Sequence, residues 1–312
     1  MRIGLMLGDN SVERGSVEAL VAEVKRAEQD GFATAWFPQI FGIDAMTVLA
    51  VAGTQTSTIE LGTAVVPTYP RHPVAMAQQA LSVQAASNNR FALGIGLSHQ
   101  IVIEGMFGLS FAKPYSHMKE YLAVLAPLIR EGAVSHSGSE YRVNASIKVP
   151  GASPCPILLA ALAPKMLALA GSEADGTVTW MTGAKTLREH IVPRIQEAAS
   201  SAGRRPPRVV AGLPIAVTND VGAARAAAAS VFQIYGGLPS YRAMLDREGV
   251  QSPEEVALIG DEDTVGEQIE RLKDIGVTDL LAAQFPLGGE TAATHQRTRA
   301  LLCKLKASLS SM

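Results

Sequence analysis

Short apolar runs, five to nine residues long, recur along the chain and alternate with stretches of helical spacing. Each run is apolar on both faces, which is typical of parallel strands buried between two layers. Turn residues such as glycine and proline bound most of them. The pattern predicts eight strands, at Ile3–Leu7, Ala33–Phe37, Leu61–Val66, Phe91–Ile95, Ile157–Ala161, Thr177–Met181, Val209–Val217 and Asp279–Phe285.

Helices are expected between these strands. Apolar residues recur at helical spacing from Val17 to Ala27, after Ser16 as a possible N-cap and before Gly31 as a C-cap. Similar patterns predict helices at Pro73–Ala86, Tyr115–Ile129, Pro164–Ser172, Ala184–Ala202 and Thr264–Ile275. The alternation favours an α/β fold, a (β/α)8 TIM barrel that occupies residues 1–312 as a single domain. An open, doubly wound sheet is the competing architecture.

Two connections are too long for a simple βα unit and are expected to be insertions. Residues 131–155, after strand 4, contain polar and apolar runs around Ser137–Ser139, as in a hairpin. Residues 218–263, after strand 7, contain an alanine-rich helix around Ala223–Phe232 and a second helix near Ser240–Glu248. An insertion at this place can form a lid over a barrel mouth.

Composition narrows the classes of function. The 312 residues carry a formal net charge of -2 and no basic stripe, so nucleic acid is an unexpected partner. Cys155 and Cys303 stand far apart, which argues against a disulfide scaffold or a metal site and favours a cytoplasmic protein. No apolar run reaches the roughly 18 residues that span a bilayer, so we expect no membrane partner.

The segment Glu60–Gln100 holds the strongest candidate site. Its second strand ends in Gly94-Ile95-Gly96-Leu97-Ser98-His99, at the end where barrel enzymes carry their active sites. A dinucleotide fingerprint would need glycine in place of His99 and a helix that starts at once, which we do not expect here. A nucleophile elbow would need glycine in place of Gln100. A tight strand exit without a ligand is the alternative.

Individual side chains near the expected mouth suggest roles. His99 could donate a proton, although a hydrogen-bonded structural histidine is equally consistent with the sequence. Arg71 and His72 could bind an anion or simply begin a helix at Pro73. The segment from Leu162 to Met166 joins a strand to a helix and could cradle a phosphate, or be a plain loop. Substrate rings could stack on large apolar side chains at strand ends, namely Trp36, Trp180 and Met181.

Taken together, several motifs resemble one family. They are Trp36-Phe37-Pro38-Gln39, Leu61–Val66 with Arg71-His72-Pro73, Arg90–Gly96, and Ala163-Pro164-Lys165-Met166 running to Ala174-Asp175-Gly176. Over nearly its whole length the chain resembles the luciferase-like monooxygenase superfamily, within it the oxidoreductases that use the 5-deazaflavin coenzyme F420. The resemblance implies a non-proline cis peptide at Ala64-Val65 behind the deazaflavin ring. It also implies a homodimer.

The same resemblance assigns the site. Residues that would contact the cofactor ring or side chain are Gln39, Ala64, Val65, Val66, Pro67, Ile95, Gly96 and Gln100, with Ser98 and Gln100 as polar positioning groups. Leu162, Ala163, Lys165 and Met166 would surround the cofactor phosphate, to which Lys165 adds positive charge. No metal is expected.

The implied activity is hydride transfer between the deazaflavin and a small organic substrate, with His99 or water as the source of the proton. Sugar-phosphate dehydrogenases of this family carry a histidine and a glutamate where this chain has Ile40 and Leu97, so that substrate class is not expected. Two alternatives stay open: an FMN-dependent monooxygenase on the same scaffold, and a non-catalytic flavin-binding protein.

Overall fold

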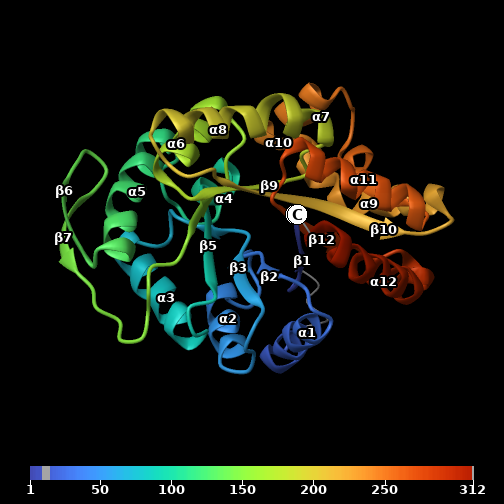
Figure 1. Ribbon diagram of the computed structural model, residues 1–312. Helices are drawn as coiled ribbons and strands as arrows, with labels where there is room; N and C mark the ends of the chain where they lie inside the picture. Colours follow the sequence, from blue (N-terminus) through green and yellow to red (C-terminus); the bar gives the residue numbers. More distant parts are fainter. Residues whose placement is uncertain (9–14, 311–312) are drawn as a thin grey trace.

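Parallel strands form a closed barrel in the computed structural model, which describes residues 1–8 and 15–310 (Figure 1). The ring closes because β9 pairs with β8 on one side and with β10 on the other. The fold is the predicted (β/α)8 barrel, not an open sheet. Its strands are β1 (Arg2–Met6), β2 (Thr34–Phe37), β3 (Glu60–Thr63) with β4 (Val66–Pro67), β5 (Phe91–Gly96), β8 (Ile157–Leu159), β9 (Gly176–Trp180), β10 (Arg208–Val217) and β12 (Asp279–Gln284).

Helices surround this barrel on the outside (Figure 1). They are α1 (Val17–Gln29), α2 (Ala45–Gly53), α3 (Pro73–Ala86), α4 (Gln100–Gly105), α5 (Pro114–Arg130), α6 (Pro164–Glu173), α7 (Ala184–Thr186), α8 (Val192–Ser201), α9 (Val221–Gly237), α10 (Pro239–Glu248), α11 (Glu262–Ile275) and α12 (Thr291–Ser310). The sequence pattern did not predict α2, α4 or α12. Most residues of α2 are buried, so it shows no polar face to reveal its period.

Local chemistry explains where several helices begin and end. The Ser16 side chain accepts a hydrogen bond from the Ala19 amide, as expected for an N-cap, and Asp44 and Asp261 cap α2 and α11 in the same way. The C-cap of α1 is Asp30, and Gly31 follows it with a φ of +74°. The predicted C-cap was therefore one residue late, although glycine supplies the left-handed turn.

The third barrel strand is interrupted, where the sequence predicted one continuous run. β3 ends at Thr63, the Ala64–Val65 peptide bond is cis as the resemblance implied, and β4 resumes at Val66. The predicted helix over residues 184–202 is likewise not uniform. α7 passes through a π-helical turn (Leu187–Ile191) into α8, where Pro193 lacks the N–H that a regular helix would use.

Both predicted insertions are present. The first contains an antiparallel hairpin, β6 (Ala133–Ser137) with β7 (Arg142–Ser146). The Glu120 carboxylate holds its turn by accepting the backbone N–H groups of Ser139, Glu140 and Tyr141, each at 2.9 Å. The second contains α9 and α10, then a 3-10 turn (Pro253–Val256) and an unpredicted strand, β11 (Leu258–Gly260), which pairs with β10.

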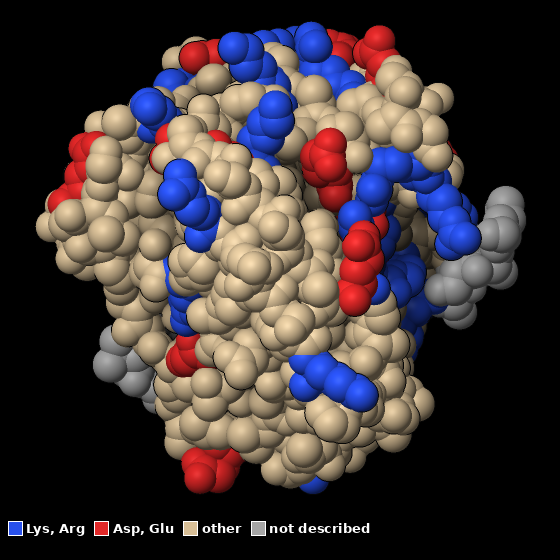
Figure 2. Space-filling view, turned by 90° about the vertical axis from the view of Figure 1, so that its left-hand side faces the viewer, with Lys and Arg blue, Asp and Glu red and all other residues tan. Residues whose placement is uncertain are grey.

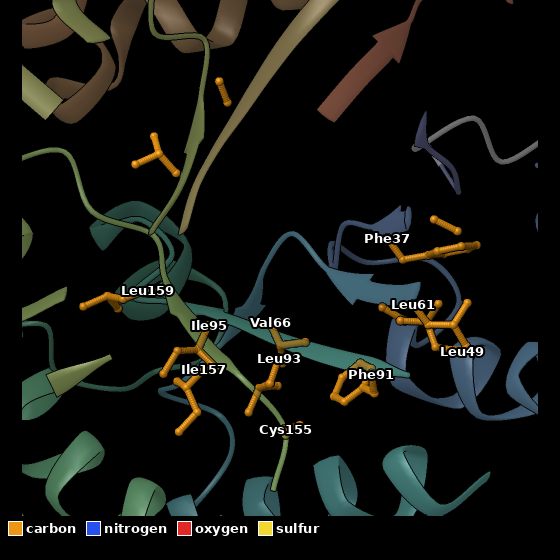
Figure 3. Close-up of a cluster of buried hydrophobic side chains, with 14 of the residues drawn as sticks. Phe37, Leu49, Leu61, Val66, Phe91, Leu93, Ile95, Cys155, Ile157 and Leu159 are labelled. Carbon is orange, nitrogen blue, oxygen red and sulfur yellow. The ribbon is translucent and has the colours of Figure 1, made fainter. Parts of the chain in front are cut away.

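One hydrophobic cluster lies under the second insertion, and the core of the barrel itself has two layers. The larger lies between the barrel and its helices, where Val66, Leu93, Ile95 and Ile157 point into the same space (Figure 3). The smaller lies inside the barrel. It is closed at the amino-terminal end of the strands by an ion cluster of Arg2, Glu60, Arg208 and Asp279.

On the face that carries the β6–β7 hairpin, charged side chains of both signs are interspersed around a broad uncharged area (Figure 2). Within the residues that the structure describes, no helix combines the length and the apolar character that a bilayer crossing requires.

Candidate active site

The carboxyl ends of three neighbouring barrel strands meet at one side of the mouth. Val66 pairs with Ile95, and Pro67 pairs with Gly96. From the other side, Leu159 pairs with Ile95. Four residues predicted to contact the cofactor are therefore brought together by strand register alone.

The top of the barrel interior forms a partly exposed apolar surface. Met6, Ala64, Val65 and Trp180 are half-buried and rest on a buried layer inside the barrel. We call these four residues the apolar floor. That buried layer consists of Trp36, Ala92, Leu158, Val178, Val210 and Leu281. A flat ring can lie on such a surface and remove it from water.

Close packing shapes the edge of the apolar floor. A Cβ atom added at Gly96 would lie 2.7 Å from Val65 Cγ2 and 3.2 Å from Ala160 Cβ, so only glycine fits without a shift. Thr63 fixes the neighbouring strand, because its hydroxyl donates to Gly94 O and accepts from Gly94 N, both at 2.8 Å. The apolar floor thus extends from Val65 past Gly96 to Ala160, at the start of the loop after β8.

Two residues just beyond barrel strands adopt left-handed backbone conformations that side chains disfavour. Ser98, after β5, has a φ of +60°, and Met181, after β9, has a φ of +52°. Such conformations persist when surrounding contacts enforce them, and they cluster at functional sites. Both outliers lie at the carboxyl end of the barrel, where the candidate site is.

His99 lies at the mouth directly before α4. Its ring centroid is 5.7 Å from that of Tyr241 in α10, and burial lowers the pKa of His99 below its ordinary value. The imidazole is therefore neutral at pH 7, able to offer one N–H donor and one acceptor. The sequence predicted that no helix follows the end of β5 promptly. That prediction was wrong, because α4 begins at Gln100, after only three intervening residues.

An aromatic cluster from the second insertion lies over the mouth. Tyr235 and Phe232 of α9 contact Trp180 edge-on, with ring centroids 6.0 and 5.9 Å away. Tyr241 packs against Tyr235 at 5.0 Å, and Phe285 contacts Phe232 at 5.6 Å. These rings link α9 and α10 to the carboxyl ends of β9 and β12. We call this aromatic cluster, which packs on Trp180 at the edge of the apolar floor, the roof.

The loop from Leu162 to Met166 leads into α6 with its first amides free of any side-chain cap. Ala163 occupies the N-cap position and cannot accept a hydrogen bond through its side chain, unlike the serine and aspartate caps of other helices. Ala163 and Lys165 are exposed. Free amides, the helix dipole and a lysine at one place favour an anion such as a phosphate.

A buried histidine holds the loop from Leu162 to Met166 in place. His190 Nε2 donates to the Leu162 carbonyl at 2.7 Å, while Arg194 Nε donates to His190 Nδ1 at 2.9 Å. Burial lowers the pKa of His190, and the nearby cations Arg247 and Arg194 act in the same sense against the opposing bond to Leu162. The neutral ring, protonated on Nε2, satisfies both contacts and fixes the position of the loop.

The sequence comparisons agree with this geometry. Residues 1–279 match the sequence profile of luciferase-like monooxygenases. The chain belongs to the luciferase-like monooxygenase family. A 5,10-methylenetetrahydromethanopterin reductase from Methanolobus tindarius is 28% identical over 295 residues, which cover 85% of this chain and 89% of that one. A protein of Mycobacterium tuberculosis, provisionally named a coenzyme F420-dependent oxidoreductase, is 34% identical over 190 residues, covering 56% of this chain and 54% of that one.

A solved structure shares the fold. The coenzyme F420-dependent tetrahydromethanopterin reductase of Methanopyrus kandleri superimposes with a TM-score of 0.81 at 24% identity, over 97% of each chain. The shared fold therefore includes the two insertions as well as the barrel.

Side-chain directions restrict what several predicted residues can do in this luciferase-like protein. Val66 and Ile95 are fully buried and point outward into the layer between barrel and helices, so only their backbone can face the mouth (Figure 3). The side-chain oxygen of Gln39 accepts from the Ala45 amide at 2.8 Å, at the start of α2. Gln100 is exposed and donates to Glu104 at 2.9 Å.

The sequence predicted Trp36 and Met181 as lining of an open pocket, but both side chains are buried. Trp36 is fully buried inside the barrel because its ring lies against the bare backbone of Gly62, where an added Cβ would approach it to 2.3 Å. Met181 is only 1% exposed and packs into the cluster under the roof. Of the three candidates for the substrate pocket, only Trp180 has surface at the mouth.

Arg71 and His72 serve the start of a helix and its surroundings. Arg71 forms an ion pair with Asp44 at 2.5 Å, and His72 Nδ1 accepts from the Val74 amide at 3.3 Å as the N-cap of α3. These contacts agree with the interpretation that both residues serve the start of the helix. They do not support the alternative, an anion-binding pair.

The sequence interpretation missed several residues of the site region, among them Tyr235, Tyr241 and His190. The tyrosines stand in an insertion more than fifty positions after the nearest predicted site residue, and His190 lies 28 positions after the carbonyl that it holds. The sequence does place both tyrosines close to Gly236-Gly237, in an insertion long enough to form a lid, and this could have marked them as candidates.

Proposed function

We propose that this protein is a coenzyme F420-dependent oxidoreductase that transfers a hydride between the deazaflavin and a small organic substrate. The observation that carries the proposal is the partly exposed apolar floor, where Val65 and Ala160 pack on Gly96. Ala160 stands four residues before the uncapped start of α6 at Pro164. A ring on the apolar floor and an anion at the start of α6 would then lie next to each other, as a phosphate-bearing deazaflavin requires. The names of the relatives in M. tindarius and M. tuberculosis support the same interpretation.

The residues present fit such a cofactor. The apolar floor would support the ring, with Val65 held in place by the strand end at Gly96. Lys165 and the first amides of α6 would bind the phosphate, on a loop that His190 fixes. When bound, the deazaflavin gives or takes a hydride at its central ring.

The other contribution of the protein is to place the substrate and to deliver a proton. Hydride addition to a C=O, C=N or C=C bond moves the bonding electron pair onto the second atom, which then takes up a proton. His99 stands at the end of the strand exit after β5, and its neutral form has one N–H to offer. The ring of Tyr241 lies beside His99, so its hydroxyl is a second candidate donor.

A sugar phosphate does not suit this mouth. The positions that would carry a histidine and a glutamate hold Ile40, which is exposed, and Leu97, which packs against the outer core. Neither side chain can hydrogen-bond a hydroxyl or a phosphate. We therefore propose a less polar substrate.

The proposal is tested by anaerobic fluorescence titration of the protein with F420 and, separately, with FMN. We expect saturable binding of F420 and weak binding of FMN. In Gly96→Ala, the new methyl group would displace Val65, so F420 affinity should fall at least tenfold. The control is Gly266→Ala in α11, where an added Cβ meets nothing within 4 Å.

Three other outcomes would contradict the proposed function. Preferential binding of FMN, with oxygen uptake by the reduced complex, would assign the protein to the monooxygenases that give the family its name. Stoichiometric F420 binding without turnover of any acceptor would indicate a binding protein. Binding of neither cofactor would refute the site.

A further inference from the structure

Exposed apolar side chains concentrate at one place on the described surface. Twelve large apolar side chains are exposed among the described residues, and seven of them lie in two short segments. One segment follows β2 and the other comprises α4 and the residues just after it. We call the seven the apolar rim: Ile40, Phe41, Ile43, Ile101, Met106, Phe107 and Leu109. A contiguous apolar patch of this kind marks a binding surface on a soluble protein.

The two segments of the apolar rim lie side by side. Phe41 and Phe107 are in contact, with ring centroids 6.3 Å apart. Each segment begins at the carboxyl end of a barrel strand, β2 or β5, directly after the site residues Gln39 and His99. The apolar rim is therefore continuous with the candidate active site, and His99 connects it to the aromatic roof through Tyr241.

The carboxylates within this region are already engaged. Asp44 pairs with Arg71 at 2.5 Å. Glu104 accepts from Gln100 at 2.9 Å and from the Phe111 amide at 3.2 Å. A charged ligand would thus find little to pair with at the apolar rim, whereas an alkyl or ring system would gain by covering it.

We propose that the apolar rim binds the non-reacting body of the substrate, and that this substrate is an uncharged compound with an extended alkyl or ring portion. The proposal rests on the proposed function, because the reacting end must reach the apolar floor. Phe41 and Phe107 are its principal contacts, since they are the aromatic members and remain 57% and 42% exposed without a ligand.

The test measures binding, not turnover. A series of methyl ketones from butan-2-one to decan-2-one is titrated calorimetrically into the protein, with and without F420. Full burial of a methylene tightens binding about fourfold, and a half-open surface such as this one should give about twofold per methylene. Decan-2-one, with six more methylenes, should therefore bind roughly 60-fold more tightly than butan-2-one.

Variants identify the surface responsible. Phe107→Ser and Phe41→Ser should each lower the gain per methylene, and Phe107→Leu should keep most of it. Val221→Ser is the matched control, because Val221 is 38% exposed at the start of α9, outside the apolar rim. Circular dichroism establishes that each variant is folded.

Equal affinity for the short and long ketones would overturn the proposal, as would an unchanged gain per methylene in Phe107→Ser. Sedimentation of the same variants adds a third refutation: a wild-type dimer that Phe107→Ser converts to a monomer would make the patch an interface between copies. If F420 fails to bind while the chain-length dependence persists, the proposed function fails and the apolar rim stands.

Discussion

Replacing Asp279 by asparagine should destabilise the barrel strongly. This residue closes the amino-terminal end of the barrel, where its side chain is only 3% exposed. Its carboxylate accepts from Arg2 Nε at 2.7 Å, from Arg208 Nη2 at 2.8 Å and from the Thr278 hydroxyl at 2.7 Å. The neutral amide would leave two guanidinium groups with Glu60 as their shared carboxylate, so part of their charge would be buried without compensation.

The expected magnitude follows from this burial. Removing one partner of a buried ion pair costs about 3 to 5 kcal/mol. The lower end applies here, because Arg2 is 41% exposed and water can compensate part of the lost charge. At roughly 2.1 cal/mol/K per residue, the unfolding entropy of this chain is about 0.65 kcal/mol/K, so about 3 kcal/mol corresponds to a Tm lowered by about 5 °C.

The pH dependence has a defined sign. Burial would raise the pKa of Asp279, but Arg208 and Arg2 together hold it below its ordinary value. The contribution of the carboxylate is complete above its unfolded pKa of about 3.9 and is lost as pH falls through the lower folded pKa. The Tm difference between wild type and Asp279→Asn should therefore shrink only below about pH 4.

Thermal unfolding followed by circular dichroism at pH 7 and at pH 3 measures both effects. The control is Glu262→Gln, which removes an exposed ion pair with Arg297 and should leave Tm unchanged. If Asp279→Asn unfolds at the same temperature as this control, the ion cluster is not a structural element of the barrel.

Three further predictions concern the site and the hairpin. In His99→Ala, the pH profile of kcat should lose a transition that lies below 6.5, because burial lowers the pKa of His99; an unchanged profile removes it from proton transfer. His190→Ala should weaken F420 binding roughly tenfold by releasing Leu162 O, His190→Gln should restore most of it, and equal affinity of all three proteins would contradict the role. The Tyr141 amide and its neighbours lower the pKa of Glu120 to about 2, against the opposing effect of burial. Glu120→Gln should accelerate hydrogen exchange in the hairpin turn, and the wild-type protection should be present above about pH 4 and lost toward pH 2; equal exchange in both proteins would refute this.

The alternation of apolar runs with helical periods predicted parallel strands and favoured the barrel, while ring closure was decided by the pairing of β9 with β10. Each strand run is apolar on both faces because helices cover one side and side chains inside the barrel cover the other. Every strand must meet this requirement by itself, so every run shows it in the sequence. The hairpin and the helices of the second insertion were predictable from other local signals, the turn residues Ser137–Ser139 and an alanine-rich segment. The helix α2 was not, since burial on most of its surface removes the polar positions that reveal a helical period.

The candidate site was predictable only in part, because side-chain direction depends on distant contacts. Trp36 stands at a strand end, where either an open mouth or a filled interior is possible. The bare backbone of Gly62, on the neighbouring strand, favours the interior by making room for the ring. Ile95 and Val66 likewise point outward because their registers place them there, so they offer the mouth only backbone atoms.

The barrel, its two insertions and the strand ends at which function concentrates were all readable from the order of residues, since apolar period and glycine placement are local properties of the chain. Which groups meet at the mouth depended on long-range packing. Tyr241 reaches His99 across 142 positions of sequence, and His190 reaches Leu162 across 28. The first contact arises from how the second insertion packs back on the barrel, and the second from how the turn before α8 packs against the loop before α6. Contacts between residues so far apart are not encoded in any local pattern.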